Sequence, residues 1–289
     1  MPPSPSVQSQ YLLVLDGQAT SMRSVDGGAI KGEVVIVNSG SEKFAQKQIA
    51  GVRFEPFTFE VGLGMGKSLV QWIAGSLDLS RTRRSGSVVT ANFDHKAQEY
   101  RHFRDALITE VTVPKMDGSS KDAGYFTIKF DPEEITYAKG DGAVVQDGVN
   151  TKQKAWLCSN FRVRVGKLPC SRVASVDSFT IKQGTGKQGT GIEFPNLKIR
   201  FSAADAAAWQ DWFNEFVVQG KNGQDKELEG AIEFLDPTLK EVLGSIELSQ
   251  IGIFSLAPEK QEAGSEAVAR FSVELYVEQM TLDIKAEAV

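Results

Sequence analysis

Two glycine-rich segments have the composition of phosphate-binding loops. The first, Gly62–Ser68, reads GLGMGKS, and the backbone N–H groups of such a turn, followed by Lys and Ser, can bind phosphate. The nucleotide-binding motif needs four residues between its two glycines, which would put the first glycine at Val61. The surrounding sequence also has the pattern of β-strands instead of an alternating α/β fold. We therefore interpret this segment as a strand-to-helix connection and predict that it binds no nucleotide.

The second segment, Gly184–Gly191, reads GTGKQGTG and matches the letters of the dinucleotide fingerprint. That fingerprint works between a strand and the N-terminus of a helix, where the helix dipole meets the pyrophosphate. Here a strand pattern, Ile192 to Phe201, follows instead. The spacing therefore predicts a hairpin loop and no dinucleotide site.

The residues that most often bind metals or act as nucleophiles are scarce. His95 and His102 are the only histidines, and Cys158 and Cys170 are the only cysteines. If residues 96–104 were helical, the two imidazoles would lie two turns apart, too far for one metal ion. The thiols are expected to be small buried or half-buried groups, and the sequence has no serine-nucleophile motif. We predict no catalytic residue, no metal and no cofactor.

Composition excludes several classes of protein. The 289 residues are 41% hydrophobic and 24% charged, with a net charge of −5, which is typical of a globular protein and disfavours wrapping of duplex nucleic acid. No stretch is long and apolar enough to span a bilayer. The segment Met1–Ser6 lacks the features of a signal peptide, so synthesis in the cytoplasm is expected. A basic cluster is interpreted as a solvated or subunit-contact surface: Arg81, Arg83, Arg84, Arg101 and Arg104.

The sequence repeats itself once. Ser24–Lys31 (SVDGGAIK) and Ser175–Lys182 (SVDSFTIK) share five of eight residues, and similar elements follow both in the same order. The repeat predicts two domains, residues 1–145 and 150–289, joined by a polar, Gly-rich linker over residues 139–154.

Alternation of apolar and polar residues predicts about six strands in each copy, enough for a small sandwich or barrel. The expected strands are Tyr11–Leu15, Gly32–Val37, Val52–Val61, Ser87–Asp94, Leu107–Val113 and Tyr125–Phe130, then Phe161–Val165, Val176–Lys182, Ile192–Phe201, Leu228–Leu235, Leu243–Phe254 and Ala269–Leu282.

One helix is expected in each copy, near residues 67–78 and 203–218. In the second helix the aromatic residues recur at helical spacing after a capping-box arrangement of Ser202 and Asp205. We predict that the aromatic residues of the two helices are core anchors or structural and assembly residues: Trp72, Trp209, Trp212, Phe213 and Phe216.

Several motifs of the first copy resemble one protein family. They are GLGMGKSLVQWI at residues 62–73, RSGSVV at 84–89, NFD at 92–94, ALITEVTVP at 106–114 and SSKDAGYF at 119–126. Over roughly residues 50 to 135 they resemble the tail tube family of contractile-tailed phages and phage-like contractile injection systems. The second copy is similar only in the order of its elements and in its Trp-bearing helix.

The resemblance implies a mainly β fold with a few helices: two tandem tube-type barrel or sandwich domains, each with one flanking helix. In this family six domains form a ring around a lumen, and rings stack. A chain with two such domains could build the ring as a trimer, a pseudo-hexamer, or six chains could form it with one domain each at the lumen. The implied partners are further copies, stacked rings, sheath and baseplate proteins, with contacts between rings through loops near residues 38–50 and 184–191.

Two other functions remain open at this stage. The same fold could serve as a baseplate hub or adaptor ring that nucleates the tube. A more distant alternative is an enzyme without a recognisable motif.

Overall fold

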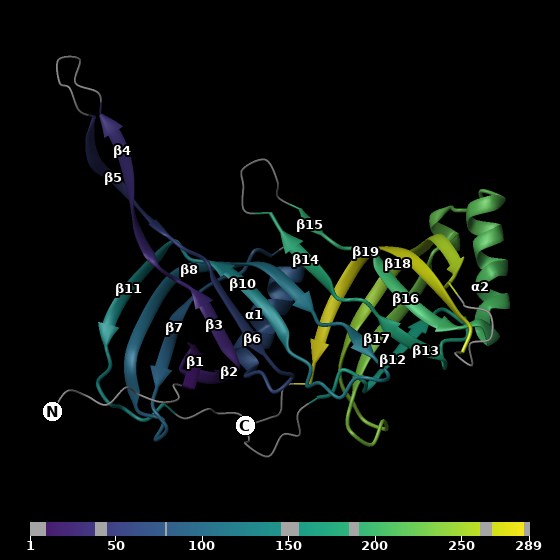
Figure 1. The fold of residues 1–289 in the computed structure, drawn as a ribbon, viewed down its shortest axis with the longest axis horizontal. Helices are drawn as coiled ribbons and strands as arrows, with labels where there is room; N and C mark the ends of the chain where they lie inside the picture. Colours follow the sequence, from purple (N-terminus) through teal and green to yellow (C-terminus); the bar gives the residue numbers. More distant parts are fainter. Residues whose placement is uncertain are drawn as a thin grey trace.

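The computed structural model describes residues 10–37, 45–78, 80–145, 156–184, 191–260 and 268–285. Two large antiparallel sheets lie side by side along its long axis, and a two-stranded arm projects beyond the first (Figure 1). The fold is mainly β with few helices, which confirms the predicted fold class.

The first sheet is built mainly from the N-terminal half. Its strands are, in spatial order, β2 (Gln18–Met22), β1 (Gln10–Leu15), β7 (Arg83–Ala91), β8 (Ala97–Val113), β10 (Phe126–Asp131), β6 (Phe57–Val61) and β3 (Ser24–Gly27). The long strand β8 also pairs with β11 (Glu134–Lys139) and with β14 (Phe179–Gln183), which in turn pairs with β15 (Ile192–Glu193). The arm consists of β4 (Ile30–Val37) and β5 (Gln46–Phe54).

The second sheet is built mainly from the C-terminal half. Its spatial order is β12 (Phe161–Val165), β17 (Leu228–Leu235), β18 (Val242–Pro258), β19 (Arg270–Ile284), β16 (Leu197–Ser202), β13 (Val173–Val176) and β9 (Met116–Asp117). The strand β9 comes from the N-terminal half of the chain.

Each half has one principal helix. The first, α1 (Lys67–Leu77), begins where its sequence predicted. The second, α2 (Ala206–Phe213), follows a 3₁₀ turn at Ala203–Asp205 and continues into a π-helical turn at Asn214–Val218. A further 3₁₀ turn covers Gln224–Lys226. The hydroxyl of Ser202 accepts a bond from the N–H of Ala204, 3.4 Å away, so this serine caps the helical segment.

Two of the expected strands are interrupted by proline, and one segment that was considered as a helix is a strand. The expected strand Val52–Val61 is divided into β5 and β6 at Pro56, and Ile192–Phe201 is divided into β15 and β16 at Pro195, because proline cannot donate to the ladder. The segment 96–104, considered above as a helix, lies in β8.

The aromatic core spans both halves. In the first half, Phe57, Phe103 and Phe130 pack around Trp72, and in the second half Phe201 stacks on Trp209 with ring centroids 5.0 Å apart. Most buried apolar residues of both halves belong to one contiguous cluster, and a smaller separate cluster lies in the first half: Leu12, Ala19, Val89, Ala91 and Ala97. The two sheets are therefore not separate modules with separate cores.

Candidate assembly interface

The two halves of the chain are joined by exchanged strands. Strand β14 of the second half pairs antiparallel with β8 of the first, with Phe179 opposite Val113 and Lys182 opposite Glu110. Strand β9 of the first half pairs with β13 of the second, with Val176 opposite Met116. Each sheet is thus extended by a strand from the other half, the mode called strand addition when it occurs between molecules.

Side chains reinforce the β8–β14 pairing. The hydroxyl oxygens of Thr112 and Thr180, which lie directly opposite each other, are 2.8 Å apart. The hydroxyl of Ser178 donates to the carbonyl of Val113 at 2.9 Å. The guanidinium of Arg81 donates to the carbonyl of Gly184 at 2.7 Å. The junction therefore uses distributed backbone and side-chain bonds.

An aromatic cluster packs beneath the junction. Trp156 is 2% exposed, and its ring lies 4.8 Å from that of Phe234 and 6.2 Å from that of Phe126. Its indole N–H donates to the carbonyl of Asn160 at 2.9 Å. The ring fits because Gly124 has no side chain: a Cβ there would lie 2.0 Å from the indole carbons. Helix α1 also contacts β19 of the second half, so the junction is packed as well as hydrogen-bonded.

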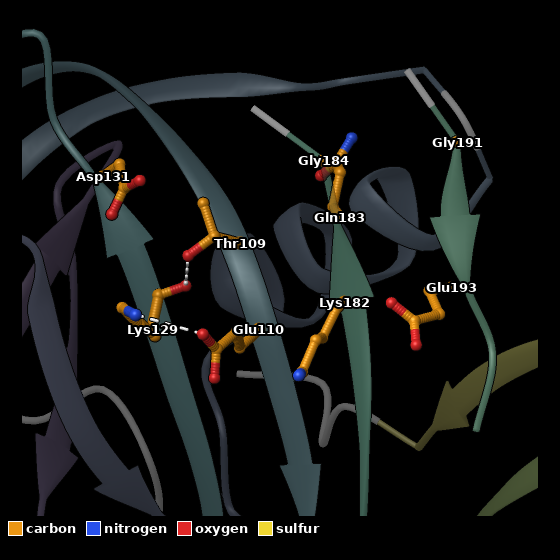
Figure 2. A pocket seen from close by; sticks show the side chains of 9 residues that line it. All are labelled: Thr109, Glu110, Lys129, Asp131, Lys182, Gln183, Gly184, Gly191 and Glu193. Atoms are coloured by element: carbon orange, nitrogen blue, oxygen red, sulfur yellow. Dashed lines mark hydrogen bonds and ion pairs between the residues drawn. The ribbon is translucent and has the colours of Figure 1, made fainter. Parts of the chain in front are cut away.

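An open pocket of about 450 Å³ lies on the junction between β10, β8, β14 and β15 (Figure 2). An ion pair of 3.0 Å joins Lys129 to Glu110 across the two strands. One carboxylate oxygen of Asp131 and both amide atoms of Gln183 are buried without a hydrogen-bond partner among the described residues. Burial raises the pKa of Asp131; the charge of Glu110 adds to this, and that of Lys129 opposes it. The complete lining is Thr109, Glu110, Lys129, Asp131, Lys182, Gln183, Gly184, Gly191 and Glu193.

Two amides of the Gly62–Ser68 segment are already occupied by side chains of a neighbouring strand. The N–H of Gly66 donates to the hydroxyl of Thr20 at 3.1 Å, and the N–H of Ser68 donates to the side-chain oxygen of Gln18 at 3.2 Å. Both partners lie on β2. The start of α1 is therefore anchored to the sheet by the groups that a phosphate would need, which fits the interpretation as a strand-to-helix connection.

The histidines and cysteines lie apart from one another. The Nδ1 of His102 on β8 is 2.6 Å from the hydroxyl of Ser87 on β7, and His95 lies in the turn between these strands. Burial raises the pKa of both thiols, Cys158 and Cys170, so they are protonated near neutral pH. Among the described residues no three His, Cys, Asp or Glu side chains are grouped to hold a metal ion. In the same part of the chain, no helix is long and apolar enough to cross a membrane.

The basic cluster bonds to groups of the same chain. Arg83 pairs with Glu133 at 2.7 Å, Arg84 with Asp16 at 3.2 Å and Arg104 with Glu134 at 2.8 Å. The guanidinium of Arg101 donates to the carbonyl of Gly27 at 2.9 Å. These four residues connect strands and loops of the first half, and Arg81 connects the first half to the end of β14.

The five predicted helix aromatics divide into two groups. Trp72 and Trp209 are fully buried and Phe216 is 4% exposed. Trp212 and Phe213 are half-buried and pack against the edge of the core. The indole N–H of Trp212 is buried and has no partner among the described residues. Their role in assembly stays a prediction.

Three of the expected features fall largely outside the described residues. They are the centre of the linker (146–155), the tip of the 184–191 loop (185–190) and part of the 38–50 segment (38–44). The strands that flank the last two loops, β14 with β15 and β4 with β5, pair as hairpins.

The β4–β5 arm presents apolar side chains to the surroundings. Val34, Ile36, Ile49 and Val52 are each at least 60% exposed, and the arm extends well beyond the first sheet (Figure 1). Exposed apolar strands of this kind are a liability in a monomer and are usually covered by a partner. Periodicity predicted β4 but gave no sign that it leaves the sheet, since that depends on pairing.

The first half of the chain matches a known family. Residues 7–136 match the family model of the T4-like virus tail tube protein gp19. This match confirms the resemblance to tail tube proteins. It supports a structural role for the chain as a tail tube component. A search of curated protein sequences found no match.

Several solved structures that are similar to part of this chain belong to contractile injection systems. They include the tube-terminating cap of the anti-feeding prophage (TM-score 0.41, 15% identity, 48% of this chain and 94% of the other). Another is the sheath–tube complex of the extracellular contractile injection system PVC in its extended state (TM-score 0.42, 18% identity, 48% of this chain and 94% of the other). A third is the sheath/tube terminator of the same system in its extended state (TM-score 0.42, 18% identity, 48% of this chain and 99% of the other).

Proposed function

We propose that this protein is a tandem tube protein that self-assembles into the inner tube, or a tube-like ring, of a phage tail or phage-like contractile injection system. Each chain supplies two tube units, and three chains form a pseudo-hexameric ring. The ring stacks on further tube rings and contacts sheath and baseplate proteins within the assembled particle. Its role is structural and not enzymatic.

The tandem part of the proposal is supported by matching strand orders. The first sheet runs β1-β7-β8-β10-β6-β3, and the second runs β12-β17-β18-β19-β16-β13. When the six strands of each sheet are counted in chain order, both sheets have the same spatial order: first, fourth, fifth, sixth, third, second. The helices also correspond, since α1 follows β6 and α2 follows β16, the third strand of each set.

The match extends to single glycines. A Cβ on Gly86 would lie 2.4 Å from the carbonyl oxygen of Val14, and one on Gly230 would lie 2.3 Å from that of Arg164. Both glycines sit beside a register shift in the strand that follows the helix.

The ring is supported above all by the β8–β14 pairing. This pairing joins one unit to the next by continuing a sheet, which removes an exposed strand edge. A ring of units joined in this way closes when the last unit pairs with the first. The junction joins two different surfaces, a hairpin of one unit and the β8-type edge of the next. A chain in a ring must therefore present an unpaired hairpin at one end and an unpaired edge at the other.

Mass photometry or light scattering at micromolar chain concentration tests the stoichiometry. A particle of three times the chain mass of 31.5 kDa supports the pseudo-hexamer, whereas six chains would mean that one domain of each faces the lumen. Electron microscopy then separates filaments, expected of the tube shaft, from single rings, expected of an adaptor. A monomer at every concentration, without rings or filaments, would refute the structural role.

A further inference from the structure

We propose that the β4–β5 arm of one chain adds to the free edge of β18 in the next chain, at Ser255–Pro258. This inference rests on the proposed ring and names the strands that close it. The binding partner of the arm is thus a second copy of this chain. The junction between chains repeats the β8–β14 junction found within the chain.

The arm corresponds to the β14–β15 hairpin. The aligned sequences SVDGGAIK and SVDSFTIK place Gly28–Lys31 in register with Phe179–Lys182. The pairing within the two hairpins agrees, since Lys31 lies opposite Arg53 and Lys182 lies opposite Glu193. Each of these partners lies four residues before the next strand begins, β6 at Phe57 and β16 at Leu197. The segment of β14 that pairs with β8 therefore has its equivalent at the base of the arm.

The acceptor edge corresponds in the same way. On β8, Val111 lies opposite Ile128 and the register shift skips Thr109; on β18, Leu256 lies opposite Val273 and the shift skips Phe254. Counting from these shared irregularities, Ser255–Pro258 is the equivalent of Glu110–Val113. The latter is the segment that receives β14.

This edge of β18 is open in the described part of the chain. Strand β17 pairs with β18 only as far as Ile251, while Ser255–Pro258 pairs on its opposite side with β19. Phe254, beside the opening, is 41% exposed. Unpaired backbone groups on such an edge are a template for a further strand, and at Pro258 the edge offers only a carbonyl because proline has no N–H.

The arm has the matching edge, which pairs with no strand among the described residues. In the single chain, the side chain of Tyr137 on β11 bonds to the backbone of this edge. The tyrosine hydroxyl accepts a bond from the N–H of Ile30 at 3.2 Å and donates to the carbonyl of Gly28 at 3.0 Å. The carbonyl of Ala29 instead accepts a bond from Glu55 on the hairpin partner β5, at 2.9 Å. The N–H of Ile30 and the carbonyl of Gly28 therefore point away from the hairpin, toward the side on which a strand would add, whereas the N–H of Gly28 donates to the carbonyl of Pro56 at 3.0 Å. An incoming β18 displaces the tyrosine hydroxyl.

The correspondence fixes the register between chains. Ile30 lies opposite Leu256, and Ala29 lies opposite Ala257. Because Ile30 directs its hydrogen-bonding groups toward the neighbour, Ala29 and Ala257 form a non-hydrogen-bonded pair, in which side chains approach most closely. The equivalent pair within the chain is Thr180 and Thr112, whose hydroxyls touch.

Disulfide cross-linking tests this register in the full chain. The double variant Ala29→Cys with Ala257→Cys, treated with oxidised glutathione, is expected to give covalent dimers and trimers on a non-reducing gel. The matched positive control, Thr112→Cys with Thr180→Cys, has the same geometry within one chain and should cross-link without a change in mass. Ala29→Cys with Phe254→Cys, three residues out of register, and the unmodified chain give the background.

The outcomes separate the arm from the ring. If the unmodified protein forms rings and the internal control cross-links, but neither the double variant nor a mixture of its two single variants does, the arm proposal is wrong and the ring stands. If out-of-register thiols cross-link equally well, the register is wrong. If the unmodified protein forms no ring at all, the proposed function fails together with the arm.

Discussion

Trp156 should couple the unfolding of the two halves of the chain. Its ring packs against Phe126 of the first half and Phe234 of the second, and it is 2% exposed. Truncation to alanine removes a buried aromatic, which costs about 3–5 kcal/mol, and leaves the carbonyl of Asn160 without its donor, at about 1 kcal/mol more. We expect Trp156→Ala to lower the free energy of unfolding by about 5 kcal/mol in total.

The size of the cooperative unit sets the resulting change in melting temperature. The entropy of unfolding is about 2.1 cal/mol/K per residue, so the 289 residues give about 0.6 kcal/mol/K if they unfold together. The loss then lowers Tm by about 8 °C in a single transition. If only one half responded, that half would melt about 16 °C earlier by the same relation, and the other would keep its original Tm.

Differential scanning calorimetry at one fixed chain concentration distinguishes these cases, since assembly makes Tm depend on concentration. The conservative variant Trp156→Phe keeps a ring in the cluster and should lose much less. A split endotherm in Trp156→Ala, with one peak at the wild-type temperature, would refute the shared core. An unchanged Tm would refute the packing role of this residue.

Three further predictions concern single side chains. Trp209→Ala should cost about 3–5 kcal/mol, and Phe213→Ala clearly less because Phe213 is half-buried; equal stability of Trp209→Ala and wild type in chemical denaturation would contradict the packing. Gly86→Ala and Gly230→Ala should each cost about 1–3 kcal/mol by forcing a Cβ into a backbone carbonyl, and a cost at only one of them, measured by thermal unfolding, would weaken the tandem proposal. The raised pKa of Asp131 means that its ionised form destabilises the folded state at neutral pH. The cost disappears as pH falls through that pKa toward the unfolded value of about 3.9, so Asp131→Asn should melt higher than wild type at pH 7 and lose this advantage in acid; the same advantage at both pH values would rule out titration as the cause.

Strands with one buried face could be predicted from the sequence. Phe126–Asp131 alternates strictly between buried and half-buried residues, and so does Thr109–Val113 within the predicted strand Leu107–Val113. The first part of β8, Ala97–Arg104, could not be recognised, because only Ala97 and Phe103 are buried and polar residues fill most positions between them. Its strand structure depends on pairing with β7 and β11, which local periodicity does not encode.

The candidate interface was the least predictable part. The sequence predicted a hairpin loop at Gly184–Gly191 and strands on either side of the 38–50 segment, but not that the first hairpin pairs across the halves while the second projects. That choice depends on register between segments about 70 residues apart, such as Thr112 and Thr180, and two-residue alternation is the same in either arrangement. The polar pocket follows from the same register, since its lining residues come together only when β14 lies beside β8.

The covalent connection between the halves changes how a ring of these chains would respond to dilution. The strands β8 and β14 belong to one molecule, so their effective concentration does not fall as the protein is diluted. Only the contacts between chains obey mass action, and every dissociation event releases tube units in pairs. A disassembling particle would therefore lose whole chains whose β8–β14 edges remain covered. Within the ring, the strand edges that each loss newly exposes are those of the arm and of β18.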